Sequence, residues 1–135
     1  MEFRSKIDFL LVGLLNLVVL IPFIMGIREN PVIDWYTFGI ISAVLVFINW
    51  LSFGTKYIIA NDLLIVKAGP LTWKIKVATI NRIVMKPKFP YWSSPAMSLD
   101  RIELDYAGKF LLLSPLEKEA FINKLVELNP RIEIL

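Results

Sequence analysis

The sequence predicts a transmembrane hairpin of two helices followed by one small α+β domain, in which antiparallel strands are closed by a C-terminal helix. Two observations carry this prediction. Two runs of 19 residues without any charge, 9–27 and 35–53, occupy the N-terminal part of the chain. After residue 55, apolar and polar residues alternate as in half-buried strands, and one segment with helical spacing follows. We therefore expect a membrane hairpin in residues 1–54 and a soluble domain in residues 55–135.

The composition excludes several kinds of chemistry. Cys and His are both absent from the sequence, so disulfides, thiol nucleophiles, haem ligation, ordinary zinc sites and Ser–His–Asp triads are not available. Hydrophobic residues make up 56% of the chain and charged residues only 20%, and the apolar excess is concentrated in the first 53 residues. This distribution favours membrane spans over an oversized core. We expect no enzymatic activity, no cofactor and no metal site.

Each uncharged run is long enough to cross a bilayer as a helix, since 19 helical residues rise roughly 28 Å. A cleaved signal peptide is one alternative for the first run. Its apolar core is long for that role, and Met25-Gly26-Ile27-Arg28 lacks a small-x-small cleavage site. A pair of buried helices in a soluble protein is the other alternative, but too little chain remains to cover them.

The connection between the runs, residues 28–34, is short enough to force an antiparallel hairpin. Arg4 and Lys6 precede the first run and Lys56 follows the second, whereas the connection has a single basic residue, Arg28. The positive-inside rule therefore predicts a multi-pass membrane protein with both termini in the cytoplasm.

A few polar and aromatic residues in or near the spans have expected roles. Asn16 and Asn49 lie at similar depth and predict an interhelical hydrogen bond, with a substrate or ion site as the alternative. The spans carry no charge, which argues against transport. Four aromatic residues near the span ends are expected to act as interfacial anchors: Trp35, Tyr36, Trp50 and Tyr57.

The C-terminal part predicts about six strands and one helix. Residues 57–60 and 63–68 flank a hairpin turn at Asn61-Asp62, and residues 86–95 are expected to form a loop. Ser114-Pro115-Leu116-Glu117 has the order of a capping box, which predicts a helix from Pro115 to about Leu128. We expect one core between sheet and helix, formed by Leu71, Trp73, Ile75, Ile102, Leu104, Tyr106, Phe121 and Leu125.

Several segments of this part carry a resemblance. They are Tyr57-Ile58-Ile59, Leu63-Leu64-Ile65-Val66, Ile80-Asn81-Arg82-Ile83, the run from Ser94 to Tyr106, Leu113-Ser114-Pro115, Phe121, Leu125 and Asn129-Pro130-Arg131-Ile132. With this pattern, nearly all of residues 55–135 resembles a short bacterial PH-domain-like family, which commonly follows one or two membrane spans. The resemblance implies a PH-like fold and a binding module and, together with the two spans, a location in the bacterial inner membrane. It implies no catalytic residue and no particular ligand.

Basic residues gather in the middle of the domain. Residues 63–99 contain six basic residues and no acidic one. Two interpretations stay open: a basic face docked on anionic headgroups, or an ordinary solvated face. The adjacent Phe89-Pro90-Tyr91-Trp92 predicts a membrane wedge, a partner-binding tip or a cap over the sheet. The candidate surface consists of Lys74, Lys76, Arg82, Lys86, Lys88, Tyr91 and Trp92.

Two functions from different classes fit these features. The first is a membrane-anchored cytoplasmic binding module, acting as a scaffold or accessory subunit for a protein partner or an anionic lipid surface. The alternative is a small membrane immunity protein that protects its host against a bacteriocin or toxin. Nucleic acid is not an expected partner, because no reading motif accompanies the basic residues. Arg101, Glu103 and Asp105 alternate along one strand, which predicts cross-strand ion pairs and not acid–base catalysis.

Overall fold

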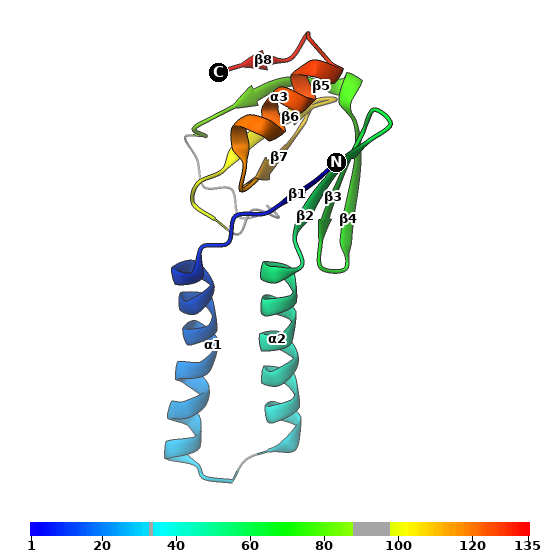
Figure 1. Ribbon diagram of the computed structural model, residues 1–135. Coiled ribbons are helices and arrows are strands. Elements are labelled where there is room, and N and C mark those ends of the chain that lie inside the picture. Colours follow the sequence, from blue (N-terminus) through cyan, green and yellow to red (C-terminus); the bar gives the residue numbers. More distant parts are fainter. Residues whose placement is uncertain (33, 88–97) are drawn as a thin grey trace.

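The computed structural model describes residues 1–32, 34–87 and 98–135. Two long helices stand below a compact domain of strands and one further helix (Figure 1). In chain order the elements are β1 (Glu2–Arg4), α1 (Phe9–Glu29), α2 (Trp35–Phe53), β2 (Lys56–Ala60), β3 (Leu63–Ala68), β4 (Leu71–Lys76), the 3₁₀ turn η1 (Val77–Thr79), β5 (Ile80–Val84), β6 (Ile102–Tyr106), β7 (Lys109–Leu113), α3 (Lys118–Leu128) and β8 (Glu133–Ile134).

Helices α1 and α2 begin at acidic caps and are apolar on every side. Asp8 accepts hydrogen bonds from the backbone N–H groups of Leu10 and Leu11, and Asp34 accepts one from Tyr36. The helices contain 21 and 19 residues with mean hydropathy 2.6 and 1.7, and only 6% of each apolar window is buried. By length and composition both could cross a membrane, and they are too exposed to be core helices of the domain.

The expected contact between the two helices is present. Asn49 Nδ2 donates to Asn16 Oδ1 over 2.9 Å. Each amide also donates to a carbonyl four residues earlier in its own helix, Asn16 to Val12 and Asn49 to Leu45. The hydrogen bond predicted from their matched depth is therefore confirmed, and it holds the two polar side chains against each other in an otherwise apolar pair.

The strands form two four-stranded sheets, in the orders β1-β2-β3-β4 and β7-β6-β5-β8. All neighbours are antiparallel except β5 and β8, which are parallel. The turn between β2 and β3 has positive φ at both Asn61 and Asp62, as a tight hairpin turn requires. A bridge between Ser5 and Pro115 joins the first sheet to the end of β7. Residues of both sheets and of α3 share one buried cluster.

Nothing in the sequence predicted β1. It pairs with β2 in the register Glu2↔Ile58 to Arg4↔Lys56, so the two long helices are an insertion between two neighbouring strands of one sheet. Phe3 is 4% exposed, and its ring packs edge-on against Phe121 at 5.3 Å between centroids. Three residues are too few for a periodic pattern, and their partner lies more than fifty residues away. The domain of residues 56–135 thus takes its edge strand from the other side of the hairpin.

The predicted start of the C-terminal helix is wrong by three residues. Helix α3 begins at Lys118, and its N-cap, Glu117, makes no side-chain capping bond. Ser114 and Leu116 are occupied by the N-terminal segment. Ser114 is fully buried with its Oγ 3.1 Å from Ser5 Oγ, and the Leu116 N–H donates to the Arg4 carbonyl at 2.9 Å. The capping-box residues therefore serve a tertiary contact that local reasoning could not anticipate.

The predicted core is mostly correct. Ile75, Ile102, Leu104, Phe121 and Leu125 are buried, and Trp73 and Tyr106 are half-buried at its rim. Two assignments were wrong. Leu71 is 49% exposed beside the β3–β4 turn, and Tyr57, expected at the membrane interface, is completely buried inside the domain. Strand β8 was also not predicted, because its two residues gain their partner only from β5.

Candidate binding surface

The outer face of the first sheet carries two of the candidate cations. Lys74 and Lys76 are exposed on β4 and alternate with the half-buried Trp73 and the buried Ile75. They therefore leave the same side of the strand, as two members of one candidate surface should. The residues opposite them on the neighbouring strand β3 are apolar, Ile65 opposite Lys74 and Leu63 opposite Lys76. Lysine stems can lie along such apolar side chains while their ammonium groups stay in water.

The remaining candidates lie elsewhere. Arg82 is on β5, in the second sheet, opposite Asp105 of β6 and beside Glu133 of β8. Both of its strand neighbours are therefore acidic residues, although no ion pair joins them to Arg82 within the described residues. Lys86 is exposed just beyond β5. The structure brings Lys74 and Lys76 together and assigns Arg82 to a different sheet.

Lys88, Tyr91 and Trp92 fall outside the described residues, and so does the aromatic loop 89–92 with its three interpretations. They stay predictions.

The same outer face contains three cations that were not grouped from the sequence. Arg4 lies opposite Lys56, and Lys56 lies opposite Lys67. The next position across, on β4, is Thr72. We call Arg4, Lys56, Lys67 and Thr72 the basal row. It could not be found from sequence alone, because its members come from four strands whose pairing includes the unexpected β1.

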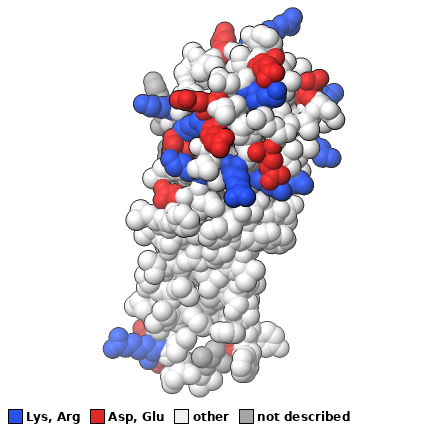
Figure 2. Space-filling model, in the orientation of Figure 1, with Lys and Arg blue, Asp and Glu red and all other residues white. Residues whose placement is uncertain are grey.

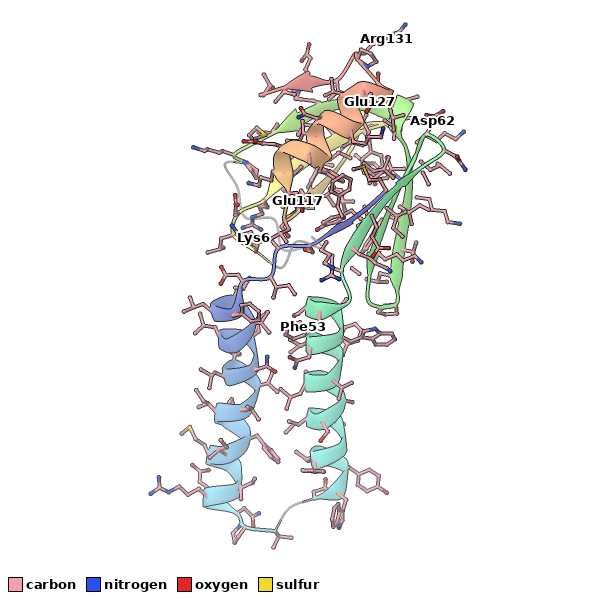
Figure 3. All side chains as sticks on the ribbon, in the orientation of Figure 1. Lys6, Phe53, Asp62, Glu117, Glu127 and Arg131 are labelled. Atoms are coloured by element: carbon pink, nitrogen blue, oxygen red, sulfur yellow. The ribbon has the colours of Figure 1, made fainter. Side chains whose placement is uncertain are left out.

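The basal row lies at the end of the sheet next to the long helices. Only Gly54 and Thr55 separate α2 from β2, and the β3–β4 turn packs on the end of α2. A Cβ on Gly69 of that turn would lie 3.3 Å from Leu51 Cδ2. Figure 3 labels Phe53 at the upper end of α2 and Asp62 at the opposite end of the sheet. Each row of opposed residues crosses the sheet, and successive rows therefore lie farther and farther from the helices.

A carboxylate secures the segment that leads into α1. Asp100 Oδ2 accepts from Lys6 Nζ at 2.9 Å, and its Oδ1 accepts from Lys118 Nζ of α3. Hydrogen bonds from Lys118 and Lys6 hold the Asp100 pKa below its usual value, since they favour the ionised form. The Asp100 N–H donates to Ser98 Oγ at 3.2 Å in the segment before β6. Asp100 therefore links the segment before α1 to helix α3, which is a structural role.

A cavity of about 390 Å³ opens between the long helices near their connecting loop. Apolar side chains such as Val19, Phe23 and Ile41 line it, with Asn30 and Asp34 also contributing. Within the described ranges no group of three or more potential metal ligands occurs. Every buried side-chain nitrogen and oxygen there has a hydrogen-bond partner.

Comparison with known proteins agrees with this architecture. The profile of the Bacterial PH domain family matches residues 55–129, which run from β2 to the end of α3. The chain therefore belongs to the bacterial PH domain family. It is similar to a Bacillus subtilis (strain 168) protein described as "Uncharacterized protein YyaB", with 30% identity over 128 residues that cover 92% of this chain and 85% of that protein. No solved structure matches the chain.

Proposed function

We propose that this protein is a membrane-anchored cytoplasmic PH-like module that serves as a scaffold or accessory subunit at the bacterial inner membrane. One observation carries the proposal: the two apolar helices are inserted between the paired strands β1 and β2. Both ends of the hairpin enter one sheet within a few residues. A domain joined in this way stands directly on the membrane surface with no flexible linker, as suits a module that works there.

The distribution of charge supports the same topology. Charged side chains occur on the domain and at the loop end of the helices, with an uncharged band between them (Figure 2). Because β1 pairs with β2, the two domain-side ends of the hairpin lie on one side of the membrane. Arg4, Lys6 and Lys56 flank those ends, which favours the cytoplasm for both termini.

The outer face of the first sheet is the proposed binding surface. PH-like domains are typically non-catalytic binding modules. On this face Lys74 and Lys76 are exposed beside the half-buried Ile65 and Leu63, so a partner would meet apolar contact area framed by cations. Exposed lysines beside apolar side chains suit a protein surface with exposed carboxylates, or the anionic lipid headgroups of the adjacent membrane.

Site-specific photo-crosslinking in native membranes tests this function. A photoreactive residue replaces Lys74 on the outer face, and a matched variant carries it at the exposed Glu119 of α3. We expect the position 74 variant to give discrete protein or lipid adducts that the position 119 variant does not give. Equal labelling at both positions, or none at position 74, would contradict a binding role for this face.

A further inference from the structure

The basal row combines like charges in a way that costs stability. Arg4, Lys56 and Lys67 occupy directly opposed positions on three neighbouring strands and alternate with the buried Phe3, Tyr57 and Val66. Lys56 therefore has the Cβ atoms of Arg4 and Lys67 about 5 Å away on either side, on one face of the sheet, and like charges in this arrangement repel. One carboxylate offsets them, since Glu2 lies 3.4 Å from Lys56 Nζ. Three cations and one carboxylate leave a charge of +2.

Two of the three cations are uncompensated. Arg4 and Lys67 form no ion pair within the described residues, although both are exposed at strand positions that place them beside Lys56. A solvated face could spread its charges along the strands, as Lys74 and Lys76 do. Here they stand side by side across the sheet, which suits one anionic group that touches all of them.

The position of the row indicates where that anion comes from. Lys56 is the third residue after Phe53, the last residue of α2, and Lys67 lies two residues before Gly69, which packs on Leu51. In the proposed membrane orientation, the row therefore lies where the helices leave the apolar layer, at the depth of lipid phosphates. Arginine can bind a phosphate through two parallel hydrogen bonds, lysine adds a point charge, and the Thr72 hydroxyl can donate a further bond.

From this register and position, we propose that Arg4, Lys56, Lys67 and Thr72 form a binding site for the phosphate headgroup of an anionic phospholipid in the cytoplasmic leaflet. The site rests on the proposed membrane anchoring. It binds the end of the sheet that lies next to the helices to the bilayer surface, and it fixes the orientation of the domain. Lys74 and Lys76, one and two rows farther from the helices, stay free for a partner.

Electron paramagnetic resonance with spin-labelled lipids tests the site on the full chain reconstituted in phosphatidylcholine bilayers. The probes are spin-labelled phosphatidylglycerol and phosphatidylcholine, and the measurement is the motionally restricted fraction of each. We expect a preference for phosphatidylglycerol of at least about fivefold, since a single basic residue near the surface contributes about that factor. R4Q combined with K56Q and K67Q should reduce it to near parity, whereas K109Q with R131Q, at exposed positions outside the first sheet, should leave it unchanged.

The outcomes separate the site from the anchoring. Absence of any restricted fraction would overturn the membrane hairpin itself. A restricted fraction without preference, or one that the triple variant retains, would overturn only the headgroup site. Inorganic phosphate added at constant ionic strength should leave the preference unchanged, and its loss would mean that the site takes free phosphate. Circular dichroism of the triple variant should match the unsubstituted protein. K67Q alone, at an exposed position, should already lower the preference measurably.

Discussion

The Tyr57 hydroxyl accepts a hydrogen bond from the Ser114 backbone N–H over 3.0 Å, deep inside the domain. The same oxygen lies 3.2 Å from Ser5 Oγ. One phenol thus joins three segments: the residues before α1, the strand that follows α2, and the end of β7. The hairpin is fastened to the domain at this point.

Replacing Tyr57 with Phe should destabilise the protein by about 1–3 kcal/mol, because the buried Ser114 N–H and the Ser5 hydroxyl lose a partner. Chemical denaturation of the full chain in mild detergent, followed by circular dichroism, gives the change. Tyr36→Phe is the control, because Tyr36 is 81% exposed at the start of α2 and should tolerate the change. Equal effects of the two substitutions would contradict the network.

Burial also raises the Tyr57 pKa above its usual value. The unfolded chain then releases this proton before the folded chain does. The contribution to stability is therefore present below about pH 10 and falls as the pH rises beyond it. Between pH 9 and 11 the unfolding midpoint of the Tyr57→Phe variant should decline less steeply than that of the unsubstituted protein. Parallel declines would show that Tyr57 ionises freely in the folded state.

Phe3→Ala should cost about 3–5 kcal/mol, as expected for a buried aromatic residue, because Phe3 packs on Phe121. The result would show that β1 belongs to the domain. Phe9→Ala serves as the control, since Phe9 is 74% exposed on α1. The measurement is the same denaturation midpoint, and an unchanged value for Phe3→Ala would mean that the domain folds without β1.

The ion pairs of Asp100 should make the free energy of unfolding depend on pH at the acidic end of the range. Its lowered pKa means that the ion pairs with Lys6 and Lys118 stabilise the fold above about pH 4 and are lost as the pH falls below it. Asp100→Asn should therefore lower the melting temperature at pH 7 and have little effect at pH 3. Asp62→Asn, in a turn that Asn also tolerates, should behave like the unsubstituted protein at both values.

The absence of Cys makes the proposed topology directly testable. A single Cys in place of Val32, in the loop between the helices, should react with a membrane-impermeant maleimide on intact spheroplasts. A Cys in place of Arg131, on the domain, should react only after the membrane is opened. The reverse pattern would place the domain outside the cell.

Most of the fold followed from local patterns in the sequence. Uncharged runs predicted both long helices, and alternation predicted about six strands where the described residues form eight. The residues that local patterns could not place are those with distant partners. The local sequence predicts a helix cap at Ser114, but its hydroxyl lies against that of Ser5. Its place beside the second span predicts an interfacial anchor at Tyr57, but this residue is completely buried in the domain. For the surface, alternation paired Lys74 with Lys76, whereas the basal row depends on strand register and so was not predictable.

The insertion of the hairpin between β1 and β2 has a consequence for biogenesis. During synthesis β1 emerges before both helices and β2, and it has no partner until these have followed. In a free chain, joining these strands would require closing a loop of about fifty residues, with the entropic cost of that search. In the proposed topology, insertion of the hairpin into the lipid bilayer would hold the two ends together before the strands pair. Folding yield should then depend on the order of translation and insertion.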